Sequence, residues 1–326
     1  MAAMSWQTTG DVTEFLAAAG PYLRRERVRN TVLLSVTETM RVNAAASAGS
    51  SSPSAGHPES ASASADGAAG RAARPLFGWW SDRAGAVAGA FMHTPPFPVV
   101  LTEVALAAAA ELAAVTLAAR PLGGVNAYPE VAEEFADGWR HGSPGGSRDG
   151  SRDRSPGGSR NGRVDVHRRQ RLYRLAELAW PDPAPAGTAR MAGDGDAKLT
   201  ADWFAAFADE VDDMGRGEDH SAAARAKISQ AGVLVWEADG QPASIACNTL
   251  PVTGMVRIGP VYTPPSARGH GYASAATAAL SHRLLEAGAE EVVLFTDLAN
   301  PVSNSIYQRI GYRPVEDRVV LAFSAD

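Results

Sequence analysis

Two stretches of the chain contain almost no large apolar side chains, and they divide its 326 residues into two blocks that can fold. The first stretch, residues 43–73, is rich in Ala, Ser and Gly. It cannot bury enough surface to offset its ordering entropy, so we expect a disordered insert. The second, residues 141–165, contains "SPGGSR" twice and is typical of a flexible Gly/Ser/Arg linker. The sequence therefore predicts one domain over 1–140 and another over 166–326.

The two blocks resemble each other over a stretch that begins at Leu76 in the first and at Val233 in the second. Each stretch has a strand ending in a tryptophan, Trp80 or Trp236, followed by a short Asp/Gly turn. A second strand of small residues, a proline-containing turn and a third strand follow. These turn signals between apolar runs predict a β-meander in each block. The similarity favours a duplication, and two unrelated hairpins are the alternative.

Apolar periodicity in the second block predicts an α/β fold, with a mixed, mostly antiparallel sheet and flanking helices. Thr200 is expected to cap a helix that buries Trp203 and Phe204 on one face. The segment 169–178 reads as a strand that could join the sheet of either domain. The other expected elements are a strand at 188–192, a helix at 221–230, a meander at 233–263, a helix at 273–288, a strand at 291–297, a helix at 301–311 and a strand at 312–323.

Composition excludes several classes of protein. The net charge of −6 and a sequence pI of about 5.7 argue against a nucleic-acid partner. A single cysteine, Cys247, excludes a disulfide within the chain, and the histidines show no metal-site spacing. The run "VALAAAAELAAVTLAA" is short and interrupted by Glu111, so we expect a buried helix and not a membrane span. The N-terminus does not resemble a signal peptide, and we expect a cytoplasmic protein without a metal.

The segment "ARGHGYASA" lies where a strand, after Pro264 and Pro265, meets a helix. Its glycines allow a sharp turn and a close approach of a ligand to the backbone. The first turn of the helix offers free N–H groups to a pyrophosphate, and Arg268 adds a cation suited to phosphate oxygens. The segment has no Gly-Lys-Ser/Thr ending, and its strand belongs to a meander, so neither a P-loop nor a dinucleotide fingerprint fits. A glycine-rich connection without a ligand is the alternative.

Two motifs at matching spacing carry a resemblance to a known family. Arg268, Gly271 and Ala273 meet the pattern Arg/Gln-x-x-Gly-x-Gly/Ala, and Asn300 is followed seven residues later by Tyr307 and then by Gly-Tyr. On these residues, the segment 188–323 resembles the GNAT superfamily of acyl-CoA-dependent N-acetyltransferases. The first block has neither motif. It resembles a degenerate GNAT-like repeat, whose expected role is to cover the second domain and shape the acceptor cleft.

The resemblance implies a fourth strand that splays away from the fifth, with the pantetheine arm of acetyl-CoA between them. It implies that backbone N–H groups of the loop hold the pyrophosphate, and that Tyr307 donates a proton to the leaving thiolate. For Asn300 a helix cap is an alternative or additional role, for His270 a solvent-facing position is favoured, and for Tyr307 a core position is the alternative. The implied cofactor-binding residues are Val261, Tyr262, Thr263, Arg268, Gly269, His270, Gly271, Tyr272, Ala273 and Asn300.

The implied activity is transfer of an acetyl group from acetyl-CoA to a primary amine of a small molecule or peptide, by direct attack in a ternary complex. A catalytically silent acyl-CoA-binding regulatory module is the alternative. Asp297 is a candidate general base, although capping, or pairing with Arg257 or Arg309, is the favoured interpretation; Glu237, Tyr262 or a water chain are weaker candidates. An acidic helical region predicts a cationic acceptor, with a solvated helix face as the alternative. Its residues are Asp202, Asp209, Glu210, Asp212, Asp213, Glu218 and Asp219.

Overall fold

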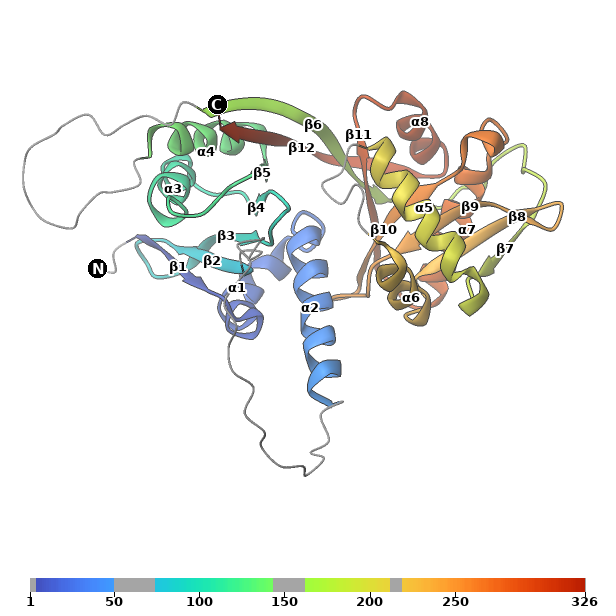
Figure 1. Cartoon of the computed structure of the whole chain (residues 1–326), viewed down its shortest axis with the longest axis horizontal. Coiled ribbons are helices and arrows are strands. Elements are labelled where there is room, and N and C mark those ends of the chain that lie inside the picture. Colours follow the sequence, from blue (N-terminus) through green and yellow to red (C-terminus); the bar gives the residue numbers. More distant parts are fainter. Residues whose placement is uncertain (1–3, 50–73, 143–161, 212–218, 326) are drawn as a thin grey trace, which may run out of the picture.

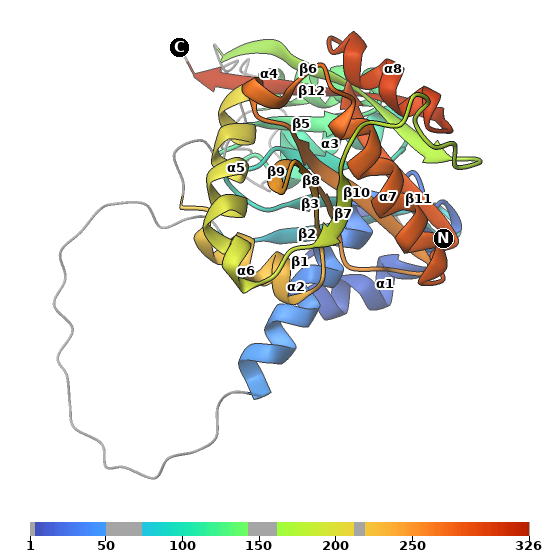
Figure 2. The ribbon, with the colours of Figure 1, turned by 90° about the vertical axis from the view of Figure 1, so that its right-hand side faces the viewer.

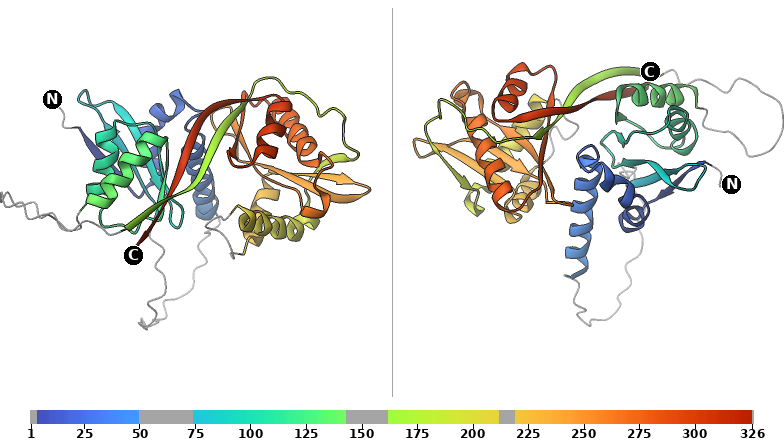
Figure 3. Two further views of the ribbon diagram at one scale, coloured as in Figure 1. Left: turned by 90° about the horizontal axis from the view of Figure 1, so that it is seen from above. Right: turned by 180° about the vertical axis from the view of Figure 1, so that it is seen from behind.

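The computed structural model describes residues 4–49, 74–142, 162–211 and 219–325. Its strands form one 12-stranded sheet in the order β1-β2-β3-β4-β5-β12-β6-β11-β10-β9-β8-β7. From one edge of the sheet, the strands β1 to β5 follow in chain order. Beyond β12 and β6, the strands β11 to β7 follow in reverse chain order to the other edge, so each half of the chain forms one end of the sheet. Figures 1 and 3 show the long strands β6 and β12 running between the two halves. The mixed, mostly antiparallel α/β fold expected from the sequence is confirmed.

The first half ends with a strand that follows its last helix. Two helices precede its meander, a third connects the parallel strands β4 and β5, and a fourth follows β5. Its elements are β1 (Ser5–Thr9), α1 (Val12–Arg25), α2 (Thr31–Gly49), β2 (Leu76–Ser81), β3 (Val87–His93), β4 (Val99–Leu101), α3 (Leu106–Glu111) with a π-helical continuation (Leu112–Thr116), β5 (Gly124–Ala127), α4 (Pro129–His141) and β6 (Gly162–Leu175).

The second half repeats this order of helices and strands element by element. Its elements are β7 (Thr188–Met191), a 3-10 turn (Asp194–Asp196), α5 (Ala197–Glu210), α6 (Ser221–Ser229), β8 (Val233–Ala238), β9 (Gln241–Asn248), β10 (Met255–Tyr262), a 3-10 turn (Pro265–Ala267), α7 (Tyr272–Glu286), β11 (Glu291–Asp297), α8 (Pro301–Arg309) and β12 (Tyr312–Ala325). The shared order supports the duplication, because unrelated hairpins would not extend to the flanking helices.

The two halves exchange their last strands. β6, at the end of the first half, pairs with β11, while β12, at the end of the second half, pairs with β5. β6 and β12 also pair with each other, antiparallel, from Tyr312–Leu175 to Ala325–Gly162. The strand expected at 169–178 therefore corresponds to the last part of β6, which ends at Leu175. It completes the sheet of the second half.

Three sequence-based expectations need correction. Residues 43–49 are helical and extend α2, because an Ala-rich run readily continues a helix that is already formed; residues 50–73 lie outside the described residues. Residues 162–165 belong to β6 and pair with β12, so the linker is shorter than expected, and 143–161 lie outside the described part of the chain. Thr200 is buried inside α5 and does not cap it, because the preceding 3-10 turn starts the helix at Ala197.

Helices cover both faces of the sheet in the second half. Helices α7 and α8 pack on one face, against Val256, Ile258 and Leu294. Helices α5 and α6 pack on the other face, against Val235 and Tyr262. Figure 2 shows α5 and α7 on opposite sides of β8 and β10. Within the described ranges, no helix is long and apolar enough to cross a bilayer.

Candidate functional site

The parallel strands β10 and β11 part in the middle of the sheet. Their pairing runs from Met255–Glu291 to Ile258–Leu294 and goes no further. β10 then shifts its register on β9 between Ile258 and Val261, while β11 stays paired with β6 as far as Asp297. The two strands therefore leave facing backbone edges unpaired, and such edges can hydrogen-bond an extended ligand. This is the splay that the family resemblance implies.

The β10 edge of this opening is held from the side of β9. The Ser244 hydroxyl donates to the carbonyl oxygen of Tyr262 at 3.0 Å and lies 2.8 Å from the Thr263 hydroxyl. The Tyr262 ring packs among the core residues under α5. Three residues are expected to line the pantetheine arm, Val261, Tyr262 and Thr263. The side chains of Tyr262 and Thr263 are held by these contacts, so these two residues can offer only their backbone groups to a ligand.

The glycine loop after β10 has the backbone conformation that a close ligand needs. Gly269 and Gly271 have φ angles of +82° and +80°, which side chains with a Cβ rarely adopt. A Cβ at Gly269 would meet no atom within 4 Å, and one at Gly271 would meet Pro185 at 3.7 Å. Gly271 is the N-cap of α7 and has no capping side chain, so the first-turn N–H groups face outward. These features fit a pyrophosphate.

His270 lies on the outside of this loop, whereas Tyr272 is partly buried and packs against the core under α7. The His270 ring is exposed and stacks on the Tyr272 ring, with centroids 5.4 Å apart and an interplanar angle of 12°. The solvent-facing position expected for His270 is confirmed.

Arg268 braces the loop against the helix α5. Its Nε donates to the Thr263 carbonyl at 2.9 Å, and its Nη2 lies 2.5 Å from a Glu210 carboxylate oxygen. Its charge is therefore balanced by Glu210, a partner that sequence reasoning missed because the two residues are far apart in the chain. A role for Arg268 toward phosphate stays a prediction.

Asn300 and Asp297 both cap local structure. The Asn300 Oδ1 accepts from the backbone N–H of Ser303 at 3.0 Å, which confirms the helix-cap role. The Asp297 Oδ1 accepts from the N–H of Ala299 at 2.8 Å. The suggested pairing of Asp297 with an arginine is wrong: Arg257 and Arg309 donate to the hydroxyl groups of Ser35 and Ser305 instead.

Tyr307 is the buried residue of α8 and belongs to the core cluster that includes Ile258 of β10. Its ring meets that of Tyr312 edge-on, with centroids 6.1 Å apart. Burial raises the pKa of Tyr307 to about 12, so its hydroxyl is protonated at neutral pH. The Tyr312 hydroxyl bonds Ser281 at 2.7 Å, whereas the described residues give the Tyr307 hydroxyl no hydrogen-bond partner.

Of the weaker candidates for a general base, Tyr262 lies at the β10 edge of the opening, with its hydroxyl 3.5 Å from a Glu210 carboxylate oxygen, whereas Glu237 lies apart from the opening. Glu237 accepts from Arg190 at 2.8 Å on β8, which β9 separates from β10. Within the acidic region, Asp202 pairs with Lys198 at 2.7 Å. Asp212, Asp213 and Glu218 lie outside the described residues, so attraction of a cationic acceptor stays a prediction. Over the described ranges, no group of three or more His, Cys, Asp or Glu side chains is arranged to hold a metal ion.

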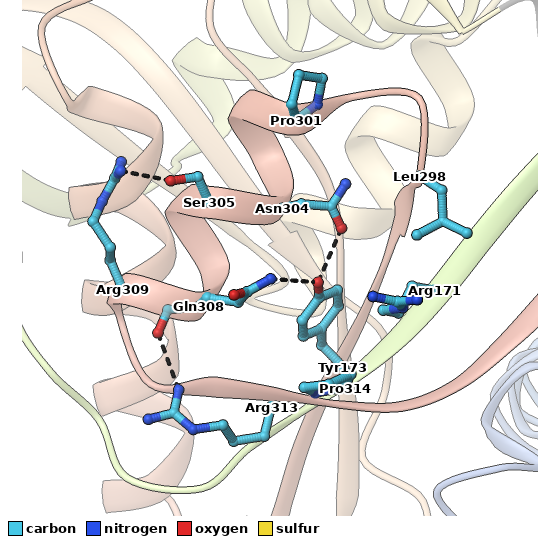
Figure 4. Close-up of a pocket in the computed structure, with 10 residues that line it drawn as sticks. All are labelled: Arg171, Tyr173, Leu298, Pro301, Asn304, Ser305, Gln308, Arg309, Arg313 and Pro314. Carbon is cyan, nitrogen blue, oxygen red and sulfur yellow. Dashed lines mark hydrogen bonds between the residues drawn. The ribbon is translucent and has the colours of Figure 1, made fainter.

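A separate surface pocket of about 700 Å³ lies beside α8, over β6 and β12 (Figure 4). The Tyr173 hydroxyl reaches it and is bonded to Asn304 and to Gln308, each at 3.0 Å. Arg171, Arg309 and Arg313 also line it. None of the residues predicted to bind the cofactor lines this pocket, so it is distinct from the opening between β10 and β11.

The first half has the parallel strand pair without the loop. β4 ends at Leu101, and α3 begins at Leu106 after an alanine N-cap, with no glycine between them. The phosphate cradle expected in the second half therefore has no counterpart here, as the sequence indicated.

Residues 197–312 match the acetyltransferase (GNAT) family model. The second half of the chain therefore contains a GNAT acetyltransferase domain. No curated protein matches the chain.

One solved structure shows the fold over the whole chain. A Drosophila protein is similar over 99% of both chains, with a TM-score of 0.61 and 12% identity. A GCN5-related N-acetyltransferase from Kribbella flavida covers 74% of this chain and 89% of its own, at 19% identity and a TM-score of 0.47. A Brucella melitensis GNAT acetyltransferase, solved in complex with acetyl-CoA, covers 43% and 89%, at 23% identity and a TM-score of 0.32. With the repeated order of elements, the full-length likeness gives a tandem GNAT-like arrangement.

Proposed function

We propose that the second half of the chain transfers an acetyl group from acetyl-CoA to a primary amine by direct attack in a ternary complex. The observation that carries the proposal is the opening between β10 and β11, followed in the chain by the glycine-capped start of α7. Tyr307 belongs to the same core cluster as Ile258, where β10 and β11 part. Acetyl-CoA would supply the thioester whose carbonyl carbon the amine attacks.

The chain's own residues supply binding and proton handling. The N–H groups at the start of α7 would bind the pyrophosphate, and the free edge of β10 would bind the pantetheine arm. As the C–N bond forms and the C–S bond breaks, the amine loses a proton to solvent or to a base, and the thiolate takes one. Tyr307 is suited to donate that proton, because its hydroxyl is protonated at neutral pH and its packed ring fixes the direction.

The second candidate is a silent acyl-CoA-binding module. A module that only binds needs the glycine loop but has no use for a proton donor, so the protonated hydroxyl of Tyr307 favours the enzyme. The test is release of free thiol from acetyl-CoA across a panel of primary amines. Amine-dependent release supports the transferase, and saturable acetyl-CoA binding without release by any amine supports the module.

A further inference from the structure

Arg257 occupies the point in β10 just before the strands part. It is in register with Val293 of β11 and precedes Ile258, the last β10 residue paired with β11. Its Nη2 donates to the Ser35 hydroxyl at 2.9 Å, and Ser35 belongs to α2 of the first half. The guanidinium therefore lies on the sheet face covered by α2, opposite the face covered by α7.

This guanidinium has no counter-charge among the described residues. Its Nε is buried without a hydrogen-bond partner, and Ser35 is its one side-chain partner in the described part of the chain. Burial lowers the pKa of Arg257 to about 10, which leaves it charged at neutral pH. A buried charge without a partner costs folding free energy. The buried Arg318 guanidinium, by contrast, bonds two backbone carbonyls and pairs with Glu316.

A second arginine lies on the same face of the sheet. On β6, Leu172 packs with the core under α2, and Arg168 lies four residues before it, so both side chains point to this face. The Arg168 Nη2 donates to the carbonyl oxygen of Val211 at the end of α5 at 2.8 Å. Two cations thus flank the region between α2 and α5, next to the start of the opening.

We propose that the acceptor amine carries a carboxylate close to its amino group and that Arg257 binds this carboxylate. The inference rests on the proposed function, since a thioester held in the opening would end near Ile258, one residue from Arg257. A guanidinium binds a carboxylate through paired N–H donors, and the unpartnered Nε is one such donor. The acceptor class is therefore the amino acids and similar small amino carboxylates.

The test compares alanine with alaninamide, which have the same shape and differ in charge at the carboxyl end. Because the amino group of alaninamide has the lower pKa, kcat/KM is calculated for the unprotonated amine of each. We expect kcat/KM for alanine to exceed that for alaninamide by about tenfold or more, since a hydrogen bond to a charged group contributes about 1.5–3 kcal/mol. In R257Q the value for alanine should fall by about tenfold to a hundredfold, with a rise in KM, while that for alaninamide should hardly change. R257K should recover part of the loss. R309Q, which removes an exposed arginine on the outside of α8, is the matched control and should keep the wild-type preference.

Equal use of the two acceptors, or better use of alaninamide, by the wild-type protein would overturn the inference. That comparison needs no variant, so it stands if R257Q fails to fold. If no amine releases thiol, the proposed function fails, and calorimetry in the presence of CoA then decides the inference separately. Binding of alanine but not of alaninamide, lost in R257Q and partly kept in R257K, supports the carboxylate site, whereas equal binding or no binding of either overturns it.

Discussion

The guanidinium of Arg318 donates a 2.6 Å hydrogen bond to the carbonyl oxygen of Leu101. The same Nη2 donates to the carbonyl oxygen of Asn126 at 3.2 Å. Leu101 ends β4 and Asn126 lies in β5, so one side chain from the exchanged strand β12 occupies backbone groups of both parallel strands. In the second half the equivalent strands, β10 and β11, leave the opening proposed for the pantetheine arm. In the first half, the position that corresponds to this opening is thus occupied by Arg318, which belongs to the second half.

Replacing Arg318 should destabilise the whole fold. Arg318 and Glu316 are both buried, and they lie 3.4 Å apart. Removing Arg318 would leave the carbonyl groups of Leu101 and Asn126 without this donor, and would leave Glu316 with only Arg29 and Tyr128 as partners. Breaking a buried ion pair typically costs about 3–5 kcal/mol. We expect R318M to lower the free energy of unfolding by this amount in urea denaturation. R309M, at an exposed site, should change it by less than about 0.5 kcal/mol. A loss below about 1 kcal/mol in R318M would contradict the role given to this side chain.

Gly271→Asp should abolish acetyl-CoA binding while the protein stays folded. The aspartate would place a negative charge at the N-cap of α7, where the pyrophosphate is proposed to bind. The control is G240D, which makes the same substitution at a similar φ, +71°, in the turn between β8 and β9. Calorimetry should find wild-type affinity in G240D and none measurable in G271D. Unchanged affinity in folded G271D would show that the loop does not hold the cofactor.

Tyr307→Phe should reduce turnover and leave binding intact. It keeps the packed ring and removes only the proposed proton donor, so kcat should fall by roughly a hundredfold. Tyr312→Phe is the matched contrast, because it removes a buried hydroxyl that is bonded to Ser281. It should lower stability by about 1 kcal/mol and keep kcat near the wild-type value. Preserved turnover in Y307F would place that tyrosine in the scaffold alone.

Acid should destabilise the first half through His93. Burial, reinforced by the nearby charge of Arg120, lowers the pKa of His93 from 6.5 to about 4. Between these values the unfolded chain binds a proton that the folded chain does not, so stability is full above pH 6.5 and falls as the pH drops toward 4. The urea midpoint should show this fall in the wild type and a shallower one in H93Q. Parallel curves for the two proteins would contradict the assignment.

Much of the second half could be predicted from local signals. The buried strand 291–297 and the helix from Ser221 were found because apolar runs end at clear turn residues. The glycine loop was found because positive φ angles favour glycine, and Asn300 because a side-chain oxygen before Pro301 is a strong helix cap.

The features that were missed depend on residues far apart in the chain. The exchange of β6 and β12 concerns which strands pair with each other, and the apolar pattern of a strand does not predict its partner in the sheet. The ion pair of Arg268 with Glu210 and the contact of Arg257 with Ser35 likewise join distant segments. One signal was available: Arg257 is a charged residue inside an otherwise apolar strand, where an unpaired charge is costly.

The central claim is that the chain holds one acetyl-CoA site, in the opening between β10 and β11, and that the first half holds none. Isothermal titration calorimetry of acetyl-CoA into the full chain tests it most directly. We expect a single class of sites, with one acetyl-CoA bound per chain. Two sites per chain, or no binding, would contradict it.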